Sequence, residues 1–535
     1  MPVVLSDHDS IINHLLKNRG LETKKQIEEF FHPPHPEKIS LKEVGLSDKS
    51  IRRAADLIRR HIHSGNQIFI YGDYDVDGLC STAILWETLH AAHSGVLPHI
   101  PHRRDEGYGL SIKGIDHCLA NGAKLIITVD NGIVAHEQVK YCRDHGCDLI
   151  IIDHHEPGDS LPPANVVLHS ASTTASGLCW FFTREYSGSP NSETLSLCAL
   201  SVICDIVPLL GINRSLAAHG LSQLNSTTRP GLLALFKEAG LLTINDHPAA
   251  INAYHVGFII GPRLNATGRL EHALESLRLL CTRNPKQASD LAAALGSINR
   301  TRQEMTRASV THALENADAV HLPKLLIAAD KSYDQGIIGL VAAKLVEKYH
   351  RPAIVISVGD TESKASARSV PGFHITDHIR RASSMLVNVG GHAMAAGFTV
   401  ETVKLEQLHK FLADLGEEKI DASLLVPKRR IDAEVSISII DLELFLKLKA
   451  FEPFGLGNPT PVFLSRNVPV SQLRQMGQNN QHLKFKAGSL EAVYFNAPDL
   501  SIAPKNYDLI FKIGLNEWNG RSHLQMIVQD IIIEL

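Results

Sequence analysis

Residues 67–78, QIFIYGDYDVDG, decide the fold of this 535-residue chain. A short apolar run leads directly into a glycine and three alternating aspartates, Asp73, Asp75 and Asp77. Similar apolar runs alternate with helical stretches further along the chain, a pattern typical of a parallel sheet covered on both faces. The stretch therefore predicts an α/β domain with carboxylates just beyond the end of a buried strand.

Two more runs end in the same way. Residues 124–132, KLIITVDNG, place Asp130 after a strand, and residues 148–157, DLIIIDHHEP, place Asp153, His154 and His155 after another. In open parallel sheets, ligands bind beyond the carboxyl ends of the strands. We expect all three strand ends to meet at one edge of the sheet.

A cluster of carboxylates is unfavourable unless a positive charge neutralises it. Oxygen and imidazole ligands without thiolate favour Mn²⁺ or Mg²⁺ over a structural zinc. Asp205, in the apolar stretch ALSVICDIVPLLGINR, is a fourth candidate ligand, although a local helix cap explains it equally well. A calcium loop fits poorly, because the position that needs Glu holds Ile84 and a strand precedes the aspartates.

Composition excludes several other classes. Hydrophobic residues make up 44% of the chain and charged residues 21%, which is typical of a globular protein. The net charge of −4 predicts that any nucleic-acid site is a local groove. Eight cysteines without a CxxC pair argue against a disulfide framework or a cysteine zinc site, so we expect a cytoplasmic protein. No apolar run approaches membrane-spanning length, and no membrane partner is expected.

The chain divides into five expected segments. A helical N-terminal segment (1–50) precedes an α/β catalytic domain with a parallel sheet (51–280). A long connecting helix (281–320) leads to a second α/β domain (321–418), and short strands with turns in 419–535 predict a small barrel or sandwich. The candidates in this last segment for contacts with a nucleic-acid strand are Lys484, Lys486, Tyr494, Phe495 and Trp518. Of these, Phe495 is expected to lie in the core.

The ordered series of short motifs resembles the RecJ family of the DHH phosphoesterase superfamily. GDYDVDG, TVDNG, DHH and the aspartate before VPL resemble the four acidic motifs. GPRLNATGR, KASARSVPGF, GGHAMAAGF and EPFGLGNPTPVF resemble later segments of that family, and the likeness covers almost the whole chain from about residue 45. The fold implied is a DHH domain, a DHH-associated α/β domain and an OB-like barrel.

The resemblance implies roles for individual residues. The implied metal ligands are Asp73, Asp75, Asp130, His154 and Asp205, holding two ions of Mn²⁺ or Mg²⁺. The implied catalytic residues are Asp75, Asp130, His154, His155 and Asp205, with Asp153 orienting the histidines. Nucleic-acid and phosphate contacts are implied for Arg103, Tyr108, Arg263, Asn265, Arg269, Ser366, Arg368 and His392. The chain departs from the family pattern at Tyr71, where some members carry His, and at Asp334, to which no role is assigned.

The implied function is a single-stranded-DNA-specific 5′→3′ exonuclease that releases 5′-mononucleotides by two-metal catalysis in recombination and repair. Single-stranded DNA is the implied partner, with a single-strand-binding protein and a RecQ-like helicase as further ones. One alternative is a DHH-type phosphodiesterase acting on oligoribonucleotides or cyclic dinucleotides. Another is a non-catalytic DNA-binding replication scaffold, which the intact acidic motifs disfavour.

Overall fold

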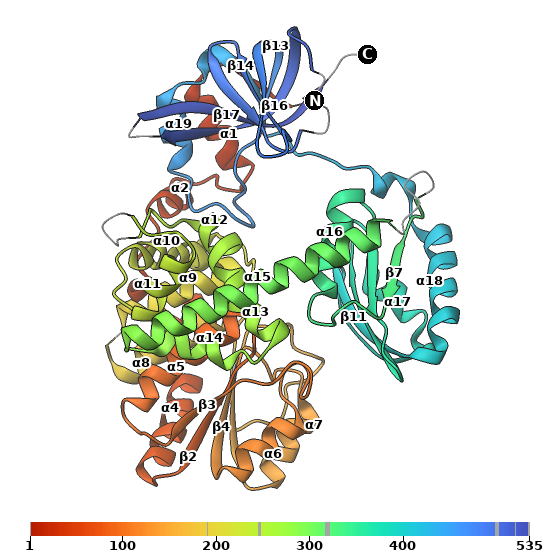
Figure 1. The fold of residues 1–535 in the computed structure, drawn as a ribbon. Coiled ribbons are helices and arrows are strands. Elements are labelled where there is room, and N and C mark those ends of the chain that lie inside the picture. Colours follow the sequence, from red (N-terminus) through yellow and green to blue (C-terminus); the bar gives the residue numbers. More distant parts are fainter. Residues whose placement is uncertain are drawn as a thin grey trace.

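The chain folds into three sheet-based modules joined by helices (Figure 1). The computed structural model describes residues 2–189, 191–243, 248–315, 322–497, 502–518 and 521–532, excepting the side chains of 517, 518 and 521. Trp518 is one of those excepted side chains. Within the described part, no helix has the length and apolar character needed to cross a membrane.

The first module is a five-stranded parallel sheet in the order β3-β2-β4-β5-β6. Its strands are β2 (Gln67–Tyr71), β3 (Val96–His99), β4 (Ala123–Val129), β5 (Asp148–Asp153) and β6 (Val166–His169). Its helices are α3 (Leu41–Val44), α4 (Asp48–His63), α5 (Val76–His90), α6 (Ile112–Ala120), α7 (His136–Asp144) and α8 (Ala175–Ser187). Ile68 and Ile70 face the core under α4, α5 and α8, while Phe69 and Tyr71 face the one under α6 and α7. Both faces are buried, which explains the continuous apolar runs.

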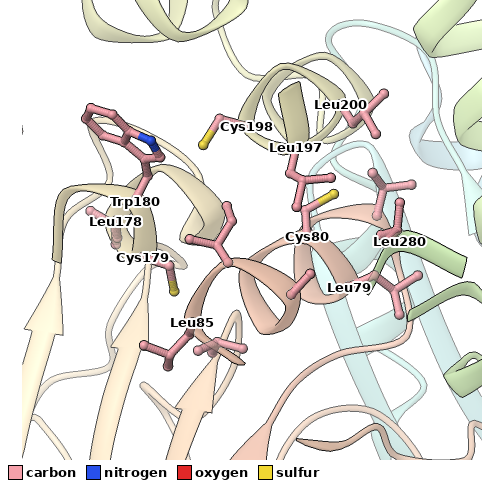
Figure 2. Close-up of a cluster of buried hydrophobic side chains, with 14 of the residues drawn as sticks. Leu79, Cys80, Leu85, Leu178, Cys179, Trp180, Leu197, Cys198, Leu200 and Leu280 are labelled. Atoms are coloured by element: carbon pink, nitrogen blue, oxygen red, sulfur yellow. The ribbon is translucent and has the colours of Figure 1, made fainter. Parts of the chain in front are cut away.

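A helical region extends this core. Its helices are α9 (Leu195–Cys204), α10 (Gly211–Asn225), α11 (Pro230–Glu238), α12 (Ala253–His255), α13 (Gly261–Leu270) and α14 (Leu274–Cys281). Figure 2 shows Leu79 and Cys80 of α5 among side chains of α8 and α9, including Trp180 and Leu197. Because α5 is buried on nearly all sides, its start is held firmly at the sheet edge.

A 31-residue helix, α15 (Pro285–Glu315), leads to the second α/β module (Figure 1). It packs against α11, α13 and α14 near its start and against α16 near its end. The second module has strands β7 (Leu326–Asp330), β8 (Ala353–Ser357), β9 (Glu362–Arg368), β10 (Leu386–His392) and β11 (Ala395–Glu401). Its helices are α16 (Ile338–Tyr349), α17 (Ile375–Arg380) and α18 (Leu405–Lys419). The sheet order is β10-β11-β9-β8-β7, with only β7 and β8 parallel.

The third module is a closed barrel. Its strands are β12 (Ala433–Val435), β13 (Phe463–Met476), β14 (His482–Ala487), β15 (Leu490–Tyr494), β16 (Asn506–Trp518) and β17 (Arg521–Ile532), with helix α19 (Leu442–Lys449). Strand β13 pairs with both β14 and β16, which closes the ring β13-β14-β15-β17-β16. A small closed barrel is the arrangement of an OB fold, and the predicted fold class is confirmed.

The first helices of the N-terminal segment pack against the barrel at the far end of the sequence, a contact that the sequence did not predict. Strand β1 (Val4–Leu5) pairs with β12, while α1 (His8–Lys17) and α2 (Lys24–Phe31) add Ile11, Leu15 and Phe30 to the barrel core. Figure 1 shows α1 beside β17 and α19, at the opposite end of the chain. A two-residue strand that pairs about 430 positions away leaves no local sequence signal.

Two aromatic side chains of the barrel also differ from expectation. Tyr494 is buried in the barrel core, whereas Phe495, expected in the core, is 51% exposed and lies edge-on to His482. The strand ends after Tyr494, so Phe495 enters a turn and points outward.

Candidate metal centre and phosphate site

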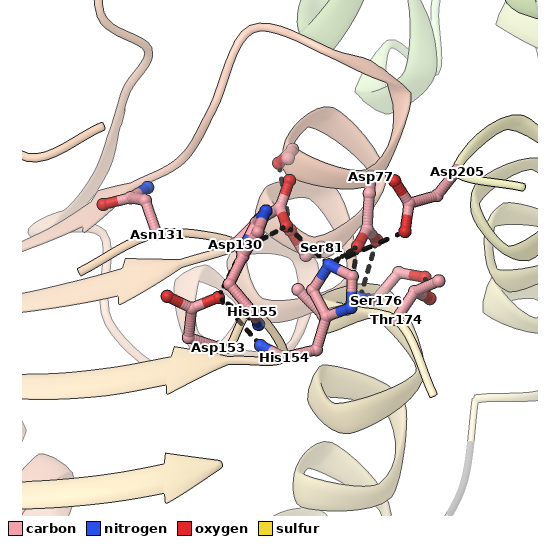
Figure 3. A network of polar contacts seen from close by, with 12 residues as sticks. Asp77, Ser81, Asp130, Asn131, Asp153, His154, His155, Thr174, Ser176 and Asp205 are labelled. Atoms are coloured by element: carbon pink, nitrogen blue, oxygen red, sulfur yellow. Dashed lines mark hydrogen bonds and ion pairs between the residues drawn. The ribbon is translucent and has the colours of Figure 1, made fainter. Parts of the chain in front are cut away.

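The acidic and histidine residues meet at the carboxyl edge of the parallel sheet (Figure 3). Strands β2, β4 and β5 are direct neighbours, so the loops that follow them lie side by side. They deliver Asp73, Asp130 and His154, while Asp205 arrives from the C-terminal end of α9. The helix end places a carboxylate opposite the strand ends and completes the cluster.

Three overlapping groups of ligand atoms could each hold a cation, with the atoms of each group within 4.8 Å of one another. They are Asp73 with Asp75 and Asp130, Asp77 with His154 and Asp205, and Asp130 with His154 and His155. The Nε2 atom of His154 lies 3.2 Å from Asp130 Oδ1 and 3.6 Å from both Asp77 Oδ2 and Asp205 Oδ2. Asp130 and His154 each belong to two groups, an arrangement suited to two adjacent cations.

The electrostatics of the cluster call for a cation. Burial, and then the charge of neighbouring aspartates, raises the pKa of Asp73, Asp75 and Asp130, and raises the pKa of Asp205 to about 8. The Asp73 Oδ1, Asp130 Oδ1 and His154 Nε2 atoms are buried without a hydrogen-bond partner. Burial also lowers the pKa of His154, which favours the neutral imidazole that binds metals. Unpartnered oxygen and nitrogen atoms around one point fit a divalent metal.

Asp77 is a functional candidate that the predicted ligand set omits. Its carboxylate accepts hydrogen bonds from the backbone N–H groups of Ala175 and Ser176, each at 2.8 Å, and from Ser201 Oγ at 2.6 Å. The N-terminus of α8 thus holds Asp77 in place beside His154. The available signal was an acidic residue at the start of an otherwise apolar helix, two positions after Asp75.

Asp153 contacts the backbone of His154 and the ring of His155. Its Oδ1 atom accepts hydrogen bonds from the His154 N–H at 2.8 Å and from His155 Nδ1 at 2.8 Å, and its Oδ2 accepts one from the Ile133 N–H at 3.0 Å. Burial opposes the charge on the His155 ring, but the hydrogen bond from that ring to Asp153 raises its pKa to about 9. The other ring nitrogen of His155, Nε2, forms a hydrogen bond of 3.1 Å with the Tyr108 hydroxyl, which brings two predicted site residues together.

Tyr71 does not face the cluster. Its side chain is buried among the residues under α6 and α7, and its hydroxyl lies 3.3 Å from the Gly109 carbonyl oxygen and 3.5 Å from Glu106 Oε2. The side chain thus leaves the sheet on the face away from Asp77 and the ligands. Its contacts assign it to the loop after β3 and away from metal binding.

Four arginines gather beside the cluster. They are Arg103 from the loop after β3, Arg269 from α13, Arg302 from α15 and Arg368 from β9. Burial, and then the charges of the other three, lowers the pKa of Arg269 to about 10. Concentrated positive charge of this kind is typical of a phosphate site. Arg302 was missed by the sequence analysis, because only the docking of α15 brings it here.

Other predicted contact residues lie around this group. The Arg103 guanidinium stacks on Tyr74, 4.2 Å from the ring centre, and Arg368 Nη1 donates to Ser366 Oγ at 3.2 Å. Asn265 Oδ1 is buried without a partner, and His392 is exposed at the end of β10. Arg263 is different, because its guanidinium donates to Glu238 at 2.7 Å and to the Ile259 carbonyl oxygen. These contacts make Arg263 a link between helices. Burial, and then the charge of Arg263, lowers the pKa of Arg302, so Arg263 also lies near the arginine group.

Comparison with known proteins identifies each module. Residues 67–206 match the DHH family N-terminal domain, residues 322–418 the DHHA1 domain and residues 431–530 the RecJ OB domain. The single-stranded-DNA-specific exonuclease RecJ of Bacillus subtilis is 32% identical over 98% of this chain and 68% of its own length. That of Salmonella typhimurium is 31% identical over 98% of this chain and 96% of its own length.

A solved structure agrees over the whole fold. RecJ from Thermus thermophilus in complex with Mn²⁺ matches with a TM-score of 0.83 and 28% identity, covering 98% of this chain and 76% of that one. A complex of the same protein with Mg²⁺ matches with a TM-score of 0.77 and 26% identity, covering 98% of this chain and 75% of that one. The chain therefore belongs to the RecJ family.

Proposed function

We propose that this chain is a metal-dependent exonuclease that degrades single-stranded DNA in the 5′→3′ direction and releases 5′-mononucleotides during DNA recombination and repair. The observation that carries the proposal is that the unpartnered carboxylate and imidazole atoms lie near a group of four arginines, one of which, Arg103, acts electrostatically on Asp73. Metal ligands next to a phosphate site suit phosphodiester hydrolysis. The relatives named single-stranded-DNA-specific exonuclease supply the substrate class.

The proposed metal ligands are Asp73, Asp75, Asp130, His154 and Asp205, joined by Asp77. The same T. thermophilus relative was solved with Mn²⁺ and with Mg²⁺, which supports either ion here. Two bound cations would lower the pKa of a water molecule and stabilise the negative charge that develops on the departing 3′ oxygen.

The remaining residues position the strand. His155, fixed by Asp153, presents its Nε2 toward Tyr108, where both side chains can contact the scissile phosphate. Arg103, Arg269, Arg302 and Arg368, with Ser366, would bind the terminal 5′ phosphate. Asn265 and His392 remain proposed contacts, and Arg263 is proposed as a support for the helices. Binding the terminal phosphate at a fixed place sets the direction of digestion.

An apolar groove offers a route for the rest of the strand. Its volume is about 870 Å³, and it runs from the residues that flank Asp205 to the segment before the barrel. Tyr254 and Phe258, both more than half exposed, stack at its edge with ring centres 5.1 Å apart, and Lys512 of the barrel also lines it. Unpaired bases stack on such aromatic side chains, whereas the bases of a duplex are already stacked on each other.

The proposed enzyme would act on DNA inside the cell, and its eight cysteines are free, as is usual in a reducing compartment. We therefore propose a cytoplasmic location. A single-strand-binding protein and a RecQ-like helicase are proposed partners, because both would supply the single strand. Pull-down of each partner with the full chain tests this part of the proposal.

The central test is digestion of a long single-stranded DNA labelled at either end, with Mn²⁺, Mg²⁺ or a chelator. We expect mononucleotides from the 5′ end with metal, no products with chelator, and little digestion of blunt duplex. A dinucleotide substrate in parallel distinguishes the short-substrate phosphodiesterases. Strong preference for the dinucleotide, or digestion from the 3′ end, contradicts the proposal.

A further inference from the structure

One loop carries three side chains that reach other parts of the molecule. Residues 102–110, here called the recognition loop, join β3 to α6 and include Arg103, Arg104 and Tyr108. Gly107 and Gly109 adopt left-handed conformations, with φ of 86° and 74°, and the loop forms no helix or strand. Its side chains keep a fixed direction only if other contacts hold the loop.

Glu106 supplies such contacts from inside the loop. One carboxylate oxygen, Oε2, lies 3.0 Å from His99 Nε2 and 3.5 Å from the Tyr71 hydroxyl, and Oε1 accepts a hydrogen bond from the His102 N–H at 3.0 Å. The side chain is only 10% exposed, whereas that of the neighbouring Asp105 is 63% exposed. Glu106 therefore ties the loop to β2 and β3.

The surroundings of Glu106 leave little room for another arrangement. A Cβ added to Gly114 of α6 would lie 2.7 Å from Glu106 Oε2, so the helix packs closely against the carboxylate. The His99 ring lies 4.7 Å from the Tyr71 ring and 5.1 Å from the His117 ring. Burial opposes the charge on Glu106, but hydrogen bonds from His99 and from the His102 N–H lower its pKa below the ordinary range. The surroundings of Glu106 therefore favour its ionised, carboxylate form.

We propose that Glu106 is a positioning residue that fixes the recognition loop, so that Arg103 and Tyr108 meet the 5′ end of the strand. The inference rests on the proposed function, in which these two side chains contact the DNA. Arg103 lies against Tyr74, and the Tyr108 hydroxyl lies 3.1 Å from His155 Nε2. A displacement of the loop by about 1 Å would misplace both side chains at once.

Glu106→Gln tests the proposal, because it keeps the shape but cannot accept from both His99 and the His102 N–H as a carboxylate does. We expect KM for a 5′-phosphorylated single strand to rise about tenfold, with kcat within about twofold. The preference for a 5′-phosphate over a 5′-hydroxyl strand should fall toward one. Asp144→Asn, an acid-to-amide change on an exposed side chain at the end of α7, should leave every parameter within about twofold.

Tyr71→Phe provides a second variant should Glu106→Gln fold poorly, because it removes only the hydroxyl. It should raise KM in the same direction by about threefold. Unchanged KM in both folded variants, or a loss of kcat with unchanged KM, overturns the proposal.

Hydrogen exchange separates this inference from the proposed function. Amide exchange across residues 102–110 should accelerate about tenfold in Glu106→Gln and remain unchanged in Asp144→Asn. If the wild-type enzyme does not distinguish 5′-phosphate from 5′-hydroxyl strands, the proposed end recognition fails, while the exchange data still decide whether Glu106 holds the loop. Unchanged exchange rates contradict the positioning role.

Discussion

Asp130 combines an unusual backbone conformation with a central place in the metal cluster. Its φ of 63° lies in the left-handed region, which Asn and Asp adopt more readily than other non-glycine residues. The next residue, Asn131, donates from Nδ2 to the carbonyl oxygens of Val129 and Gly72, at 2.9 and 3.1 Å, and so joins the loops after β2 and β4. Strain at Asp130 is thus maintained by its neighbours, as is common at functional sites.

Asp130→Asn isolates the charge from the backbone, because Asn tolerates the same φ whereas Ala does not. We expect hydrolysis of single-stranded DNA to fall by at least about a thousandfold, since one side chain contributes to two ligand groups. Affinity for the strand, measured by fluorescence anisotropy, should change by less than about threefold. Mn²⁺ should raise the Tm of the wild type but not of the variant.

The control for this prediction is Asp144→Asn, an exposed acid on α7 that should affect neither reading. Normal digestion by Asp130→Asn would show that the metal assignment is wrong.

At the scale of elements, the stability of the recognition loop should depend on pH through Glu106. The pKa of Glu106 lies below its ordinary value of 4.5, because the hydrogen bonds from His99 and the His102 N–H outweigh burial. The unfolded chain therefore binds a proton more readily than the folded chain. The stability that Glu106 contributes is present above about pH 4.5 and is lost as the pH falls through the lower, folded-state pKa.

The free energy of unfolding should accordingly fall less steeply between pH 5 and pH 3, roughly, in Glu106→Gln than in the wild type. Urea unfolding at a series of pH values, followed by tryptophan fluorescence and circular dichroism, measures the two slopes. Asp144→Asn again serves as the control. Parallel slopes for wild type and Glu106→Gln would show that the carboxylate gains nothing from its partners.

The elements also show which features of the site could be predicted from the sequence. The strands that end in Asp73, Asp130 and Asp153 were predictable, because continuous apolar runs and strand-end carboxylates are local patterns. The contribution of Asp77 depends on α8 and α9, which lie about 100 and 125 residues later. The arrival of Arg302 depends on how α15 packs. Contacts between residues so far apart in the chain leave no pattern in a short window of sequence. The types of the site residues were therefore predictable, whereas their partners were not.

At the scale of the molecule, the N-terminal segment belongs to the barrel. Arg214 of α10 joins three parts, since its Nε donates to the Phe30 carbonyl oxygen at 2.6 Å and its Nη1 to that of Phe451 at 3.1 Å. The guanidinium also lies 3.8 Å from the Phe30 ring centre. The catalytic body, the first helices and the barrel thus share one junction.

Phe30→Ala should destabilise the barrel by about 3–5 kcal/mol, because it removes a buried ring from this junction. Urea unfolding combined with hydrogen exchange should show the loss in residues 431–530 and little change in the parallel-sheet module. Phe411→Ala, on a partly exposed ring of α18, should cost under about 1.5 kcal/mol. An equal loss in both modules would mean that the barrel and the body unfold together.

The two α/β modules also meet directly, through an ion pair between Arg104 Nη2 and Asp334 Oδ2 at 2.8 Å. The other Asp334 oxygen accepts a hydrogen bond from the Gly336 N–H at 2.7 Å, and Gly336 packs against the Arg269 backbone. The pair is partly exposed and contributes at most about 1 kcal/mol to stability. Arg103 belongs to the first module and Arg368 to the second. We therefore expect the ion pair to act mainly by setting the distance between these two arginines.

Charge reversal tests this link. Arg104→Asp or Asp334→Arg alone should raise KM for single-stranded DNA by about three- to tenfold, because like charges push the modules apart. The double variant should return KM to within about twofold of wild type, and the difference should shrink between 50 mM and 500 mM salt, roughly, as screening increases. Reversing Lys344 and Glu347, a pair within α16 alone, is the matched control. A double variant no better than the single ones would show that the Arg104–Asp334 contact does not set the spacing of the phosphate site.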